Sequence, residues 1–232
     1  MTWNPVATEI TTGATDALLA VLALAVLLRL RSRAAPDRWK VGLWSWLLGL
    51  LALASSLGAV AHGIDISARA RDLLWQPLYL ALGLVVALFV VAAVRDRFGE
   101  RPARRALPWL ATAGLAFYGI TRIGAGSFLV FVAYEAAAML AALLLYADVA
   151  RRRLLAGAGW MVAGVALNLA AAAVQQSDAL LRLGSIPLDH NGLFHLVQAV
   201  AILALARGLV LGLDPRSEPE ATDCPPSPEQ AG

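Results

Sequence analysis

The chain contains three histidines, and all three fall at the predicted outer ends of apolar segments. His62 ends one such segment, while His190 and His195 begin another. Imidazole is a common zinc ligand, and three protein ligands with one water make a catalytic zinc site. The three histidines are therefore candidate metal ligands. A carboxylate could take the place of one of them, and the candidates are Asp16, Asp65 and Asp72.

The spacing around His195 predicts which side chains share its face of a helix. Asn191, His195 and Gln198 lie at positions i, i+4 and i+7, which fall on one side of a helix. His190 precedes His195 by five residues, about 140° away around the helix axis, so it is not expected on that face. Asp189 stands where an N-cap residue would begin the helix.

Polar side chains gather in the same half of the predicted helices as the histidines, and the other half is almost wholly apolar. Because polar groups in hydrocarbon need partners, we expect them to face each other or water. The pattern predicts a polar cavity in the outer half, closed by an apolar inner half, and argues against a channel or transporter. The residues expected to line it include Asp16, Tyr79, Asn168, Asn191 and Gln198.

Glu135 is the most unusual of these polar residues. It lies about two turns inside a predicted membrane helix, too deep for its short side chain to reach the interface. We therefore expect a functional or ion-paired role for it. Four other polar residues are interpreted as ordinary helix-end residues, namely Thr12, Tyr118, Gln175 and Gln176.

The composition is typical of a polytopic membrane protein. Hydrophobic residues make up 59% of the 232 residues and charged residues 15%, against about 45–50% and about 25% in soluble proteins. Seven segments are long enough to cross a bilayer, with residues 124–126 suited to a tight turn between two of them. The segments are Thr12–Leu30, Val41–Gly63, Leu73–Val94, Leu107–Ile123, Ser127–Ala147, Gly157–Gln176 and His190–Leu213. We predict an all-α, seven-transmembrane-helix bundle over residues 1–213.

Arginines set the expected orientation. They are concentrated in the first, third and fifth loops, and positive loops stay cytoplasmic. This predicts an N-terminus outside and a C-terminus inside, in the plasma membrane of a cell, with a composition typical of a bacterial inner membrane protein. Because the positive charge is spread over short loops, nucleic-acid binding is not expected. Lys40, the only lysine, is placed in a cytoplasmic loop, which excludes a retinal Schiff base inside the bundle.

The two ends of the chain lie outside the predicted helices. Residues 214–232 are rich in proline, glutamate and serine, which predicts a disordered cytoplasmic tail. The single cysteine, Cys224, lies there, so neither a disulfide framework nor a cysteine metal motif is expected. The first residues lack the basic region of a cleaved signal peptide. Nothing in the sequence sets an oligomeric state.

The histidines and the helix count resemble a known superfamily of seven-helix membrane proteins. The chain is similar to the alkaline ceramidases and the progestin and adipoQ receptors, including hemolysin III-like proteins, as a divergent bacterial member. That resemblance implies zinc held by one histidine on the second helix and an HxxxH pair on the seventh. His62 matches the first ligand and His195 the last. The remaining ligand position falls on Asn191, with His190 beside it.

The resemblance also implies a serine and an aspartate that assist hydrolysis of a lipid amide. The serine position falls on Gly58, and Ser55 and Ser56 are the nearest hydroxyls. Asp72 matches the aspartate by its position after His62. If zinc binds, these residues imply a metal-activated water that attacks a lipid amide or ester, with Asp72 or Glu135 as general base. Membrane lipids would be the partners, entering from the outer leaflet.

Two other functions fit the same histidines. The protein could be a non-catalytic sensor or scaffold in which the histidines belong to a hydrogen-bonded network. It could also be a haem protein, with His62 and His195 as axial ligands from facing helices.

Overall fold

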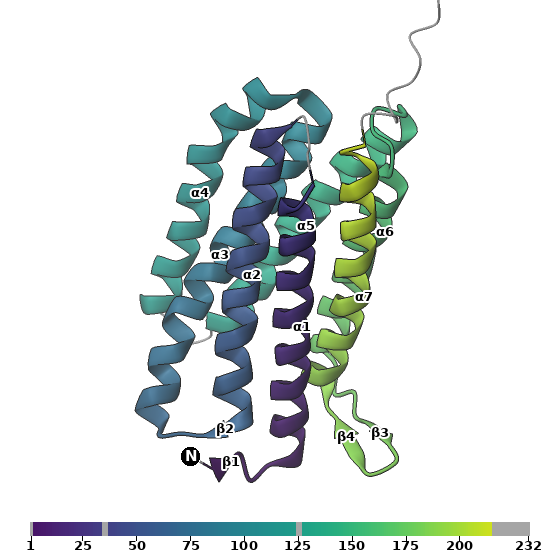
Figure 1. The fold of residues 1–232 in the computed structure, drawn as a ribbon. Coiled ribbons are helices and arrows are strands. Elements are labelled where there is room, and N and C mark those ends of the chain that lie inside the picture. The colour runs from purple at the N-terminus through teal and green to yellow at the C-terminus, as the bar shows by residue number, and fades with distance from the viewer. Residues whose placement is uncertain (1, 34–36, 124–126, 215–232) are drawn as a thin grey trace, which may run out of the picture.

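The computed structural model describes residues 2–33, 37–123 and 127–214, and these residues are predominantly helical (Figure 1). This confirms the all-α prediction. The expected tail beyond Asp214 and the turn at residues 124–126 lie outside the described residues. The helices are α1 (Ala7–Arg31), α2 (Arg38–Gly63), α3 (Ala68–Phe98), α4 (Glu100–Ile123), α5 (Ser127–Arg151), α6 (Ala158–Gln175) and α7 (His190–Leu211).

Six of these helices are long and apolar enough to cross a membrane, namely α1, α2, α3, α5, α6 and α7. They identify the chain as a membrane-embedded, multipass helical protein. Helix α4 is long enough to cross a membrane but is not among these six apolar helices. It begins seven residues before the predicted segment, at Glu100, and its first turns carry Arg101, Arg104 and Arg105.

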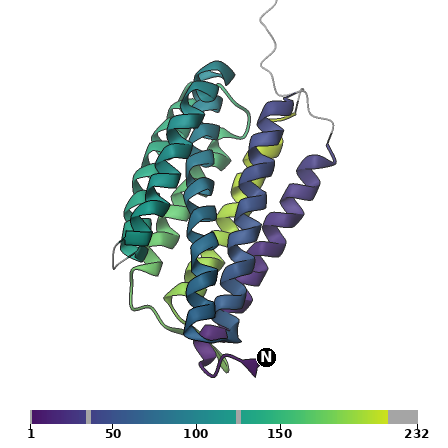
Figure 2. The same cartoon turned by 90° about the vertical axis from the view of Figure 1, so that its left-hand side faces the viewer.

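The six apolar helices form a closed ring, and α4 lies outside it. Each helix packs against the next in the order α1, α2, α3, α5, α6, α7, and α7 returns to α1. Helix α4 packs chiefly along α3, on the outer side of the bundle (Figures 1 and 2). The two helices approach closely at Gly83 and Gly114, where a Cβ on Gly83 would lie 2.8 Å from the Gly114 carbonyl oxygen.

Short strands cover one end of the bundle, which the sequence reasoning did not anticipate. β1 (Thr2–Trp3) pairs antiparallel with β2 (Ile64–Asp65), and β3 (Leu181–Leu183) pairs with β4 (Ile186–Leu188). All four lie at the end where α2 finishes and α7 begins, so they sit beside His62 and His190 (Figure 1). We call this the histidine end.

The opposite end contains a buried ion network that corrects the expected helix boundaries. The prediction that Lys40 lies in a loop is wrong, because α2 begins before it and the residue is 1% exposed. Lys40 Nζ lies 2.7 Å from Asp96 Oδ1, and Arg95 pairs with both Asp96 and Asp37. Both helices extend through residues expected to lie in loops, and these opposite charges lie between them. The ammonium group is thus in an ion pair at the end away from the histidines.

Candidate functional site

The ring of six helices encloses a cavity of about 410 Å³ that opens toward the histidine end. Polar side chains line its outer part, and apolar side chains further along the same helices line its floor. No residue of α4 lines it, so the polar residues of the fourth predicted segment, such as Tyr118 and Arg122, lie outside the cavity. The polar lining comprises Asp16, Ser55, His62, Tyr79, Glu135, Asn168, Gln175, His190, Asn191, His195 and Gln198. The floor includes Leu47, Leu51, Val86, Phe89, Met139, Ile202 and Leu205.

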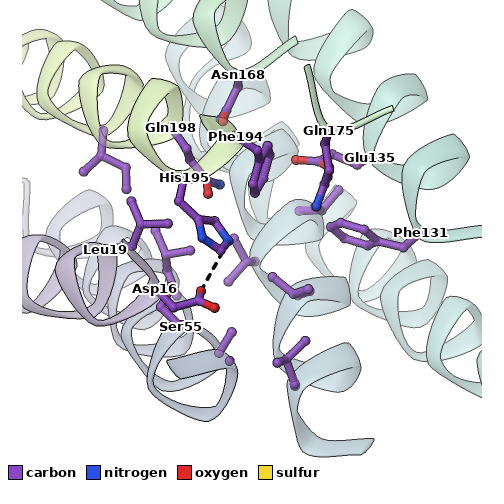
Figure 3. Close-up of a pocket in the computed structure, with 18 of the residues that line it drawn as sticks. Asp16, Leu19, Ser55, Phe131, Glu135, Asn168, Gln175, Phe194, His195 and Gln198 are labelled. Atoms are coloured by element: carbon purple, nitrogen blue, oxygen red, sulfur yellow. Dashed lines mark ion pairs between the residues drawn. The ribbon is translucent and has the colours of Figure 1, made fainter. Parts of the chain in front are cut away.

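Asp16 and His195 form a buried acid–base pair on one side of the cavity. His195 Nε2 lies 3.4 Å from Asp16 Oδ1 (Figure 3), and His195 Nδ1 lies 3.0 Å from Thr15 Oγ1. The Thr15 hydroxyl donates its one proton to the Thr12 carbonyl oxygen, 2.9 Å away, so it accepts from Nδ1–H. The tautomer assigned in this way leaves Nε2 as an acceptor facing the Asp16 carboxyl group, so a hydrogen bond between them requires one further proton on either side chain.

A glycine on α2 makes room for this pair. A Cβ placed on Gly58 would lie 2.6 Å from Asp16 Oδ2, closer than real contacts allow. The Asp16 carboxyl group therefore lies between the backbone of α2 and the imidazole of α7. Gly58 is also the position at which the family resemblance implies a serine. In this chain the position accommodates a neighbouring carboxyl group.

His62 belongs to a separate contact at the mouth of the cavity. Its Nδ1 lies 2.7 Å from Glu9 Oε2, and its ring packs edge-on against Trp75 with centroids 5.5 Å apart. The Asn4 side chain donates to the His62 carbonyl oxygen at 2.9 Å. His62 and His195 therefore face the same cavity, but each is paired with a different carboxylate.

The wall on α5 and α6 presents polar groups of another kind. Glu135 is 6% exposed, and its Oε2 has no hydrogen-bond partner among the described residues. Asn168 Oδ1 and Gln175 Oε1 are likewise buried without a partner there. The Gln175 amide nitrogen donates to Asn191 Oδ1 at 3.3 Å, which orients its oxygen away from Asn191. These three residues appear on the side of the cavity away from Asp16 in Figure 3.

Most of the predicted site residues are brought together, including His190, which the helical geometry had separated from His195. Asn191, His195 and Gln198 of α7 all line the cavity, and Asp189 is the N-cap, accepting from Gly192 N at 2.9 Å. The residues that meet in the cavity are Asp16, His62, Tyr79, Glu135, Asn168, His190, Asn191, His195 and Gln198.

Three expected residues lie elsewhere. Asp72 is exposed and lines a separate groove between α3 and α4 that also contains Arg122. Ser56 is exposed, and its hydroxyl donates to the Ala52 carbonyl oxygen at 2.7 Å. Asp65 is exposed and belongs to strand β2. Ser56 and Asp72 are close in sequence to residues that line the cavity, such as Ser55 and Trp75. Their own side chains lie on another face of the helix and do not line it.

The described donors do not form a cluster of three metal ligands. Within the part of the chain that the structure describes, no group of three or more histidine, cysteine, aspartate or glutamate side chains could hold a metal ion. A carboxylate lies against His62 Nδ1 and another against His195 Nε2. The arrangement is suited to holding and exchanging a proton beside a bound molecule.

Two residues interpreted as ordinary helix-end groups are part of the site. Thr12 is buried, and its hydroxyl donates to Asp189 Oδ1 at 3.0 Å, which joins α1 to the start of α7. Gln175 lines the cavity. The sequence contained a signal for Thr12, because Thr12, Thr15 and Asp16 lie at i, i+3 and i+4 on one face of α1.

Comparison with known proteins identifies the family but not an activity. Neither the curated proteins nor the solved structures contain a match to the chain. A family model matches residues 11–214, which include every residue that lines the cavity. The chain belongs to that family, DUF6962, described as a family of unknown function.

Proposed function

We propose that this multipass membrane protein binds an amphiphilic lipid in its cavity, with the polar group near the histidine end and the chain in the apolar floor. The change in lining from polar to apolar along the same helices carries this proposal. The Asp16–His195 pair provides polar groups beside the bound molecule, and Leu51, Phe89 and Ile202 provide apolar contacts deeper in the bundle.

The size and enclosure of the cavity also support the binding of an amphiphilic lipid. Small-molecule sites are clefts of about 300–1,000 Å³, mostly apolar with a few placed polar groups. A cavity of about 410 Å³ lies within that range. Burying a hydrocarbon chain there removes apolar surface from water, at about 25 cal/mol per Å².

The proposed orientation places the histidine end outside the cytoplasm. Most arginines lie at the opposite end, on the last turns of α1, α3 and α5 and in the connections that follow. Positive residues stay on the cytoplasmic side, so the cavity would open toward the outer leaflet of the plasma membrane. In this arrangement α4 would be a seventh span, lying beside the ring.

A second candidate function is hydrolysis of a lipid amide or ester, and the Asp16–His195 pair is the observation that favours it. The imidazole or carboxylate could accept a proton from a water that attacks the acyl carbon. The same proton would pass to the leaving nitrogen or oxygen as its bond to carbon breaks. The ceramidase-like resemblance of His62 and His195 implies such a substrate. This pathway uses no metal and neither Ser56 nor Asp72.

The first experiment compares two leucines of α2. Leu51 lines the cavity and Leu53 is 48% exposed on the outer surface of the helix. Leu51→Trp should fill the cavity, while Leu53→Trp makes the same exchange on the outer surface. Wild type and both variants would be purified in detergent, and the lipids that remain bound identified by mass spectrometry.

We expect one amphiphile to be retained by wild type and Leu53→Trp and lost from Leu51→Trp. Equal lipid content in all three proteins would contradict the binding proposal. Incubation with lipid amides and esters then tests the second candidate: cleavage that disappears in His195→Ala supports it, and full activity in that variant excludes it. Metal content measured on the same samples tests the zinc expectation directly.

A further inference from the structure

Three buried oxygen atoms without partners line the cavity wall formed by α5 and α6. They are Glu135 Oε2, Asn168 Oδ1 and Gln175 Oε1. In the order of the helix ring, α5 is three places from α1 in either direction, so Glu135 lies across the cavity from Asp16. Buried polar atoms are nearly always hydrogen-bonded, and each exception needs an explanation.

Glu135 differs from the two amides because it can ionise: a buried carboxyl group remains neutral unless a compensating charge lies beside it. Asp16 has the imidazole of His195 beside it, whereas no ion pair joins Glu135 to any described residue. Among the described residues, the cavity is lined by two carboxylic acids and three histidines but by no lysine or arginine. The protein therefore provides no permanent cation for Glu135 from the cavity lining.

The chemistry of the three oxygen atoms indicates which kind of group would bind to them. A carboxylate and two amide oxygens all accept hydrogen bonds. Gln175 is oriented by its bond to Asn191, so its oxygen is the atom left free. A protonated primary amine has three N–H donors and one positive charge. It supplies both the donors and the charge that this wall lacks.

We infer that the amphiphile bound by this protein carries a protonated amine as its head group, held by the Glu135 carboxylate with the neighbouring Gln175 as a further acceptor (Figure 3). This inference rests on the proposed function, because the same cavity must hold the apolar chain. An inorganic cation would leave the apolar floor without an occupant. Phe131, one turn before Glu135 on α5, adds an aromatic ring at the same wall (Figure 3).

The test measures binding of two matched molecules, dodecylamine and dodecanol, to the full chain in nanodiscs of zwitterionic lipid at pH 7. The amine is protonated there, and the two differ only in the head group. We expect the wild type to bind the amine at least about tenfold more tightly, since charge-assisted hydrogen bonds are roughly twice as strong as neutral ones. Glu135→Gln, which preserves the shape of the side chain, should remove the preference and leave the alcohol affinity within about twofold.

The matched control is Asp178→Asn. Asp178 is an exposed carboxylate just beyond α6 at the same end of the bundle and does not line the cavity. The control should retain the preference for the amine, which separates a specific site from general attraction by surface charge. Gel filtration of each variant shows that it remains folded.

The outcomes separate the two proposals. Equal affinity of wild type for amine and alcohol overturns the amine inference and leaves amphiphile binding intact. A preference that persists in folded Glu135→Gln also overturns it. If neither molecule binds the wild type, amphiphile binding itself fails, and the amine inference fails with it.

Discussion

The two ends of the bundle bury charged side chains in different ways. At the end away from the histidines, the Lys40 ammonium lies 2.7 Å from the Asp96 carboxylate, and Arg95 and Tyr146 also contact that carboxylate. In the cavity, Glu135 is almost as buried as Lys40 and has no charged partner among the described residues.

This difference distinguishes a structural charge from one available to a ligand. Lys40 Nζ makes no well-aligned hydrogen bond, but an opposite charge next to it balances its burial. Around Glu135 the protein leaves space instead, in a cavity of about 410 Å³. Buried ions paired within the protein join helices, and a buried ion left unpaired beside a cavity calls for a partner from outside.

The largest effect expected from this comparison is at the paired end. Asp96→Ala would leave Lys40 and Arg95 without their shared carboxylate, and breaking a buried ion pair costs about 3–5 kcal/mol. Glu100→Ala removes an exposed pair with Arg104 at the same end and should cost at most about 1 kcal/mol. Denaturant unfolding in detergent measures both. Similar losses in the two variants would show that the inner network does not hold the helices together.

A glycine substitution tests the geometry at the other end. Gly58→Ala places a Cβ 2.6 Å from Asp16 Oδ2, and such overpacking costs about 1–3 kcal/mol. Gly49→Ala lies on the same helix with nothing within 4 Å of the new carbon, so it should stabilise α2 by roughly 0.5–1 kcal/mol. Thermal unfolding should therefore shift in opposite directions. A stabilised Gly58→Ala protein would refute the close contact between α2 and Asp16.

The unpaired carboxylate predicts a gain in stability on mutation. In protein stripped of lipid, Glu135→Gln replaces a buried carboxyl group without a partner by a group that cannot ionise, and should stabilise the fold by about 1 kcal/mol. Asp16→Asn should lower stability, because Asp16 has a partner in His195. Both changes replace a carboxyl group by an amide and retain the side-chain shape. A loss of stability in Glu135→Gln would mean that Glu135 has a structural partner.

The smallest effects are expected outside the cavity. Ser56→Ala and Asp72→Asn alter exposed side chains that do not line it, so each should change stability by no more than about 0.5 kcal/mol. Neither should change the lipid retained on purification. Loss of the bound lipid in the Asp72 variant would show that the groove between α3 and α4 communicates with the cavity.

Local sequence patterns determined much of this protein. Long apolar runs identify the membrane helices, because the run length must match the bilayer. The N-cap at Asp189 and the common face of Asn191, His195 and Gln198 follow from the geometry of a single helix. The gathering of polar residues at one end also predicted where the cavity opens, since each helix contributes its own polar half.

Tertiary structure alone decided which helices enclose the cavity and how the charges are paired. Helix α4 is excluded from the ring because α3 packs against α5, and the close approach of Gly83 to Gly114 holds α4 outside. Lys40 with Asp96 and His62 with Glu9 are pairs separated by more than fifty residues, so no local pattern relates their members. A periodic pattern shows which residues face inward, whereas the neighbour that each one meets depends on how the helices pack.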